Sequence, residues 1–125
     1  SKSAFNGEIK SITVPGSKGR FQVLRNHAPI TSTLDIGMIK VDLPDGKANY
    51  YSTAGGTIEV LDNKVIVLAD SIELVSDIDE ERALQAKQRA EQRLAEKNSE
   101  INVARAQAAL SRALNRISIK EKYNK

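Results

Sequence analysis

Residues 77–116 read DIDEERALQAKQRAEQRLAEKNSEINVARAQAALSRALNR. This stretch contains no glycine and no proline, and alanine, leucine, glutamate, glutamine, lysine and arginine dominate it, which is typical of a helix. Its only polar break is Glu96-Lys97-Asn98-Ser99, where Asn98 or Ser99 can cap a second helix. Two helices of roughly 20 residues joined by so short a break fold back antiparallel, unless they fuse into one rod.

The start of the helical region carries its own signal. Asp77 stands at the expected cap, and Glu80 follows three residues later in capping-box order. Acidic residues crowd the first turn, where the helix dipole favours them. We therefore predict a helical hairpin domain over residues 77–125.

The apolar residues of this hairpin recur at intervals of three and four, so they form a seam between the helices. Its predicted members are Ala83, Ala86, Ala90 and Leu94 in the first helix and Val103, Ala106, Leu110, Ala113 and Ile117 in the second. Burying one methyl group contributes about 0.8 kcal/mol, whereas a buried leucine contributes roughly 1.5–3 kcal/mol. An alanine-rich seam therefore predicts a marginal hairpin that a ligand or partner can move with a few kcal/mol.

Residues 1–76 have a different pattern, in which short β-rich runs alternate with turn signals. The predicted turns are Pro15-Gly16, Pro44-Asp45-Gly46, Gly55-Gly56 and Asp62-Asn63. Pro44-Asp45-Gly46 is a hairpin signal, because proline sets one turn angle and glycine supplies the positive one. The predicted strands cover 9–14, 20–24, 38–43, 48–53, 57–61 and 64–69. So many short strands favour a sandwich or a barrel. The predicted class is α+β, with a β-sandwich over residues 1–76 followed by an antiparallel two-helix hairpin.

Composition and charge exclude several kinds of site. The chain has no cysteine, so disulfides, thiolate catalysis and cysteine–zinc sites are excluded, and one histidine makes a histidine metal site a poor interpretation. No apolar run approaches the roughly 18 residues of a membrane span, and no signal peptide opens the chain. Residues 1–76 carry eight basic and eight acidic residues, whereas residues 77–125 carry eleven basic and eight acidic. The basic excess of the hairpin indicates an anionic partner.

Two features of the first domain resemble sites but have simpler interpretations. His27 lies in a turn-like stretch without a nucleophile or carboxylate at triad spacing, so we interpret it as a structural histidine that bonds backbone. The segment 16–19, Gly-Ser-Lys-Gly, lacks the spacing and the ending of a phosphate loop. A plain hairpin turn is the better interpretation.

Arginines give the sharper signal. Arg82, Arg89 and Arg93 share one face of the first helix, and the same spacing recurs at Arg105, Arg112 and Arg116 in the second. In an antiparallel hairpin, guanidinium groups from both helices can converge on a triphosphate. The alternative is two solvated faces with pairs inside each helix. A nucleic acid partner is disfavoured, because no aromatic residues are interleaved with these arginines.

Five stretches of the first domain, in this order, resemble a known family. They are VPGSKGRFQVL at 14–24, NHAPI at 26–30, LDIGMIKV at 34–41, AGGTIEV at 54–60 and VIVLAD at 65–70. The family is the epsilon subunit of F-type ATP synthase, called delta in mitochondria, and the likeness runs from about Phe5 to Ile117. The family usually begins with one more strand upstream of Phe5, and relatives often carry Gly and Pro where this chain has Gln22 and Arg25.

The resemblance implies a non-catalytic central-stalk subunit that couples the rotor ring to gamma and restrains ATP hydrolysis. Its implied partners are the gamma subunit, the c-ring and the alpha and beta subunits of F1. By resemblance, the loop 16–20 and the turn 25–29, with Lys18, Arg20 and His27, form the end that faces the ring. Arg105, Arg112 and Arg116 would meet acidic segments of the beta subunit.

Some bacterial members also bind ATP in the folded hairpin, and their signature resembles residues 78–83 here. The matching residues are Glu73, Ile78, Asp79, Arg82, Ala83, Arg89, Arg112 and Arg116. ATP would then be a regulatory ligand rather than a required cofactor, and no metal site is implied. The implied location is peripheral, at the cytoplasmic face of the bacterial inner membrane or its organellar equivalent, without direct membrane insertion.

Two other functions remain open from the residues alone. One is a free adaptor whose basic hairpin recruits an acidic protein, and the other is a stand-alone nucleotide-sensing module.

Overall fold

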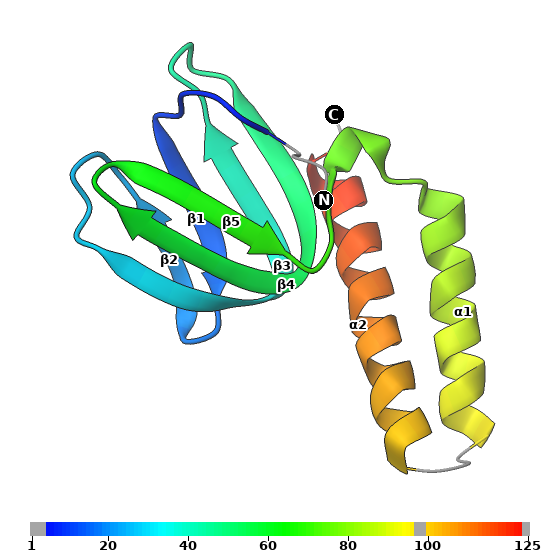
Figure 1. Ribbon diagram of the computed structural model, residues 1–125. Coiled ribbons are helices and arrows are strands. Elements are labelled where there is room, and N and C mark those ends of the chain that lie inside the picture. The colour runs from blue at the N-terminus through cyan, green and yellow to red at the C-terminus, as the bar shows by residue number, and fades with distance from the viewer. Residues whose placement is uncertain (1–4, 97–99, 124–125) are drawn as a thin grey trace. The chain divides into compact units, whose positions relative to one another are not determined.

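The computed structural model describes residues 5–96 and 100–123. It divides into two compact units, Ser1–Leu74 and Val75–Lys125. The first unit is a β-sheet and the second is a helical hairpin, and each is described separately below (Figure 1).

The first unit is a six-stranded antiparallel sheet in the order β2-β1-β3-β4-β5, with β6 also pairing β4. Its strands are β1 (Ser11–Gly16), β2 (Gly19–Val23), β3 (Ile30–Asp42), β4 (Ala48–Leu61), β5 (Lys64–Ala69) and β6 (Ile72–Leu74). One cluster of buried side chains joins strands from across the sheet, from Ile12 and Val23 to Ile58 and Val60. The sheet therefore curls over a single core, and the predicted sandwich-then-hairpin class is confirmed.

Two long strands differ from the prediction. The expected runs 48–53 and 57–61 belong to one continuous strand, β4, and β3 begins at Ile30 rather than near Met38. The glycine pair that was interpreted as a turn lies inside β4, where Gly55 and Gly56 have φ of 109° and 139°. Positive φ at these glycines lets the strand bend without ending.

The predicted turns are confirmed at three places. Gly46 has φ of 88° and its amide donates to the carbonyl of Leu43, which closes the β3–β4 hairpin. Asp62 and Asn63, both with positive φ, form the two-residue turn between β4 and β5. Residues 16–19 form the plain β1–β2 hairpin turn that the sequence favoured over a phosphate loop.

The second unit contains a short 3₁₀ turn and two antiparallel helices. They are η1 (Val75–Asp77), α1 (Glu80–Glu96) and α2 (Glu100–Tyr123). Figure 1 shows α1 and α2 side by side as separate helices, so the single-rod alternative is wrong. Among the described residues, neither helix has the length and apolarity needed to traverse a bilayer.

The cap of α1 lies two residues later than predicted. Asp79, not Asp77, is the cap, because its Oδ1 accepts from the amide of Arg82 at 3.1 Å. Asp77 instead ends η1, in which the amide of Ile78 donates to the carbonyl of Val75 at 3.1 Å. Val75 and Ile78 are both 3% exposed, so burial of these two side chains holds the 3₁₀ turn in place and delays the helix.

Candidate functional site

The seam between α1 and α2 is built from alanine, as predicted. Four alanines are 0–2% exposed: Ala83 and Ala90 in α1, and Ala106 and Ala113 in α2. The other predicted members are half-buried, and Ile119, which the prediction missed, is 4% exposed.

The register of the hairpin follows from one lysine. Lys120 Nζ donates to the carbonyl oxygens of Val75 and Ser76, at 3.3 and 3.2 Å, so the end of α2 lies beside the entry to α1. Both helices rise about 1.5 Å per residue. Counting back from this contact places Ala113 level with Ala83. The same count places Ala106 level with Ala90.

An arginine directly precedes each of the four buried alanines. These arginines are Arg82, Arg89, Arg105 and Arg112. One residue turns a helix by about 100°, so each arginine has the same angular offset from the seam. A twofold rotation perpendicular to the plane of the two axes relates antiparallel helices, so equal offsets lie on one side of the pair. Arg93 and Arg116, four residues after Arg89 and Arg112, extend the two rows. The structure therefore brings the two predicted arginine rows onto one face of the hairpin, which we call the arginine face.

The arginine face is open to solvent. Five of its six arginines are exposed and Arg116 is half-buried. The side chain of Arg82 is 81% exposed, and its Nε lies 3.6 Å from Asp79 Oδ2. An exposed pair of this kind contributes little to stability, so it leaves Arg82 able to meet a ligand.

Other residues of the nucleotide signature have structural roles. Ile78 and Ala83 are 3% and 0% exposed, so their side chains are buried. Asp79 caps α1. Glu73 lies in β6, opposite Ser52 of β4, and belongs to the sheet unit. Of the signature residues in the hairpin, Asp79 and the arginines are those with polar side chains.

The residues that the resemblance assigned to the ring-facing end, Lys18, Arg20 and His27, lie at two separate places in the sheet unit. Lys18 is exposed in the turn that begins β2, and Arg20 nearby donates to the carbonyl of Met38 at 2.8 Å. His27 lies beyond the opposite end of β2, between β2 and β3, with Nδ1 2.6 Å from the carbonyl oxygen of Ala28. Its interpretation as a backbone-bonded turn histidine agrees with this geometry.

The turn around His27 is held by a second turn. Asn26 and Asn63 bond each other twice: the Asn26 amide donates to Asn63 Oδ1 at 2.7 Å, and Asn63 Nδ2 donates to Asn26 Oδ1 at 3.1 Å. This pair ties the turn 25–29 to the β4–β5 turn. The loop 16–20 is tied to β3 instead, because the Ser17 amide donates to Thr33.

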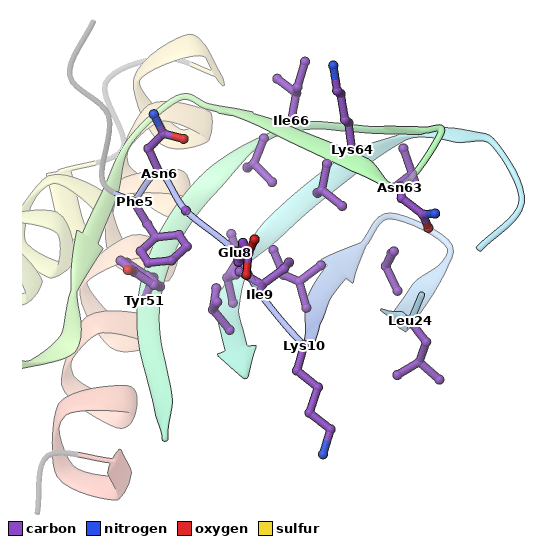
Figure 2. A pocket seen from close by; sticks show the side chains of 18 of the residues that line it. Phe5, Asn6, Glu8, Ile9, Lys10, Leu24, Tyr51, Asn63, Lys64 and Ile66 are labelled. Atoms are coloured by element: carbon purple, nitrogen blue, oxygen red, sulfur yellow. The ribbon is translucent and has the colours of Figure 1, made fainter. Parts of the chain in front are cut away.

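Sequence reasoning did not locate a pocket in the sheet unit that has both apolar and polar lining residues. The pocket has a volume of about 1350 Å³, with Ile12, Ile39 and Val60 among its apolar lining residues. In Figure 2 the segment from Phe5 to Lys10 follows one side, and β5, with Lys64 and Ile66, follows the other. In the described part of the chain, β5 pairs only with β4. The pocket thus lies beside β5, the strand at one end of the sheet order.

These features define a class: a small protein that joins a curled β-sandwich to an alanine-seamed, arginine-faced helical hairpin. The two parts match two models of one family. The beta-sandwich domain of the ATP synthase Delta/Epsilon chain matches residues 1–75, and its long alpha-helix domain matches residues 76–121. The chain belongs to the ATP synthase delta/epsilon chain family.

Curated relatives share most of the chain. The ATP synthase epsilon chain of Desulforamulus reducens is 44% identical over 120 residues, which are 96% of this chain and 90% of the relative. The ATP synthase epsilon chain of Nitratidesulfovibrio vulgaris is 44% identical over 119 residues, 95% of this chain and 88% of the relative. That of Nitrosococcus oceani is 32% identical over 124 residues, 99% and 89% respectively.

Two solved structures share the fold. A chain in the Euglena gracilis mitochondrial ATP synthase (OSCP/F1/c-ring) has a TM-score of 0.72 and 24% identity, with 82% of this chain and 64% of that chain covered. A chain in the central stalk/c-ring structure of the Tetrahymena thermophila mitochondrial ATP synthase has a TM-score of 0.58 and 14% identity, covering 90% and 82%.

Proposed function

We propose that this protein is the non-catalytic epsilon subunit of the central stalk of a rotary F-type ATP synthase. It belongs peripherally to the complex, on the cytoplasmic face of a bacterial inner membrane. The family match over both units supports this role, and so do the structural relatives, whose complexes contain F1, a central stalk or a c-ring.

In this proposal the sheet unit binds the gamma subunit and the c-ring. Lys18 with Arg20, and separately His27, are the candidate contacts with the ring. The hairpin binds the acidic surface of the alpha and beta subunits through Arg105, Arg112 and Arg116, and thereby restrains ATP hydrolysis. Complementary charge steers such an encounter and sets its specificity.

ATP binding to the arginine face gates this brake. The observation that carries the proposal is the combination of a seam of four buried alanines with six arginines on one side of it. Each alanine methyl contributes only about 0.8 kcal/mol, and like charges on one face repel, so the free hairpin is weakly held. Phosphates neutralise the arginines, so ATP stabilises the folded hairpin and competes with the acidic partner. At 100 times its Kd a ligand contributes about 2.7 kcal/mol, enough to shift a marginal equilibrium.

The brake is tested in the assembled enzyme. Removing residues 77–125 is expected to raise the ATP hydrolysis rate, and replacing Arg105, Arg112 and Arg116 together by Gln is expected to do the same in part. Replacing Lys10, Lys47 and Lys64 of the sheet unit by Gln is the charge-matched control and is expected to leave hydrolysis unchanged. Equal hydrolysis with and without residues 77–125 would overturn the brake.

ATP gating is tested by titrating ATP into the isolated protein. Heat of binding is expected for the unaltered chain, with affinity reduced at least tenfold by Arg82→Ala and by Arg112→Ala. The control Lys47→Ala is expected to bind normally. Absence of any heat at millimolar ATP would remove nucleotide gating from the proposal.

The subunit assignment itself is tested by co-purification. A tagged chain is expected to bring down a gamma subunit and the rest of F1 from its native cell. Recovery of the tagged chain without any gamma subunit would instead favour a free adaptor.

A further inference from the structure

The arginine face contains an internal repeat. The pattern Arg-Ala-x-x-Ala-x-x-Arg-Ala-x-x-Arg covers residues 82–93 in α1 and again residues 105–116 in α2. The second and ninth positions of both copies are the four buried alanines. The two copies therefore use the same residues to build the seam and to present arginine beside it.

The antiparallel register turns this repeat into a twofold pseudosymmetric surface. Ala86 and Ala109, at the fifth position of each copy, are half-buried and fall at the same level, so they mark the centre of the arginine face. Arg89 and Arg112 flank this centre. Arg82 and Arg116 lie within two residues of the same level near the start of α1, and Arg93 and Arg105 do so near its end; we call these two ends of the arginine face the linker half and the tip half. At about 1.5 Å per residue the two outer pairs are about 16 Å apart.

Each half of the face offers an equivalent set of four guanidinium groups. The linker half has Arg82 and Arg116 with the central pair Arg89 and Arg112. The twofold operation converts this set into Arg105 and Arg93 with the same central pair. The side chains between the two rows at the centre, Ala86 and Ala109, are small. They leave room for a ligand to approach the arginines of both helices.

The acidic groups on the face are also nearly symmetric. Asp79 lies 3.6 Å from Arg82 at the linker half, and Glu96 follows Arg93 by three residues at the tip half. Each half therefore holds four arginines and one acidic residue, which is a formal charge of +3. Arginine forks bind phosphate oxygens bidentately, and one half is long enough for a chain of three phosphates.

We propose that the tip half, formed by Arg93, Arg105, Arg89 and Arg112, is a second binding site for a phosphate chain. The linker half is the site of the proposed ATP gating. Only its assignment as an ATP site rests on the proposed function; the tip half does not. Because both halves use Arg89 and Arg112, occupancy of one excludes occupancy of the other. The linker half alone has the residues 78–83 that resemble the nucleotide signature, so a nucleoside triphosphate prefers it. Inorganic tripolyphosphate has no such preference.

The test is a titration of inorganic tripolyphosphate into the full chain at fixed salt. The tip double variant is Arg93→Gln with Arg105→Gln, and the linker double variant is Arg82→Gln with Arg116→Gln. Two equivalent, mutually exclusive positions predict about a twofold rise in Kd for either double variant and more than a tenfold rise when both are combined. Lys47→Gln with Lys64→Gln, in the sheet unit, is the charge-matched control and is expected to bind unchanged.

The pattern of losses distinguishes the alternatives. Loss of tripolyphosphate binding in the linker variant, with normal binding in the tip variant, would overturn the second site. Tighter binding of a hexaglutamate peptide than of tripolyphosphate would overturn the ligand class. An ATP titration runs in parallel, and ATP affinity is expected to fall at least tenfold in the linker variant only. Tripolyphosphate binding at both halves without ATP binding would retain the second site and remove the proposed ATP gating.

Discussion

At the scale of single residues, Gly56 of β4 shows that the absence of a Cβ atom allows the close approach of a neighbouring strand. Gly56 has φ of 139°, and a Cβ at this position would overlap the carbonyl oxygen of Leu68 on β5. Gly46 also has positive φ, but no atom lies within 4 Å of its Cβ position. A substitution at Gly46 therefore introduces backbone strain alone, whereas one at Gly56 introduces both strain and steric overlap.

We predict that Gly56→Ala destabilises the sheet unit by about 3 kcal/mol or more, because strain and overlap add. Gly46→Ala is the control and is expected to lose only about 1–2 kcal/mol, through strain alone. Urea unfolding followed by tyrosine fluorescence measures both. Equal losses at the two positions would mean that β5 yields to the added methyl group.

A second prediction concerns Tyr51, which is 4% exposed. Burial raises the pKa of its phenol above the ordinary value, and a hydrogen bond with the Asn49 side chain opposes part of this rise. The folded state therefore retains a proton that the unfolded state loses above the ordinary tyrosine pKa, about 10. Its contribution to stability is complete below that pH and is lost as the pH rises towards the raised pKa.

The unfolding free energy is thus expected to fall more steeply with pH above 10 in the unaltered chain than in Tyr51→Phe. The largest slope that one group can add is about 1.4 kcal/mol per pH unit. Tyr50→Phe, at a half-exposed neighbouring position, is the control and is expected to keep the steep fall. Identical pH profiles for the unaltered chain and Tyr51→Phe would contradict the assignment.

At the scale of elements, the start of α1 shows how tertiary burial overrides a local cap signal. The capping-box order predicted Asp77 as the cap, whereas the structure has Asp79 at that position. Burial of Val75 and Ile78 selects a 3₁₀ turn over Val75–Asp77, which leaves Asp79 to accept from the Arg82 amide.

We predict that Asp79→Ala destabilises α1 by about 1 kcal/mol, within the usual range for losing a cap. Asp77→Ala removes the same charge without the cap bond and is expected to cost only a few tenths of that. Amide exchange of the first two turns of α1 measures the difference. Similar exchange in the two variants would mean that charge, and not the hydrogen bond, stabilises this end.

At the scale of the whole molecule, the two units differ in what holds them. The sheet unit has a core of large side chains, including Ile39, Ile58 and Val14, each at most 1% exposed. The hairpin seam contains four buried alanines, and the larger apolar side chains that are buried among the described residues of this unit are Val75, Ile78 and Ile119. The cost of opening should therefore be lower for the hairpin than for the sheet.

Hydrogen exchange of the full chain is expected to show the amides of residues 84–96 and 102–112 exchanging at least tenfold faster than those of β3 and β4. Saturating ATP is expected to slow the hairpin amides and to leave the sheet amides unchanged. Hairpin protection equal to that of the sheet, without ATP, would contradict a marginal hairpin and weaken the gating mechanism with it.

The sequence by itself determined the order of a β-rich unit and a helical hairpin, because the apolar period and the absence of glycine and proline change together near residue 77. It also determined the alanine seam and the spacing of the arginines, since both depend only on the helical repeat. The turns at Pro44-Asp45-Gly46 and Asp62-Asn63 were readable for the same local reason.

Only the tertiary structure decided the features that depend on what packs against a segment. It made 48–61 one strand, because Gly55 and Gly56 bend it while β3 pairs along its whole length. It moved the helix cap to Asp79 through the burial of Val75 and Ile78, and it revealed the pocket beside β5. It also set which arginines of α1 lie near which arginines of α2, because that requires the antiparallel register anchored by Lys120 at Ser76, and a pattern within one helix does not contain the register between two.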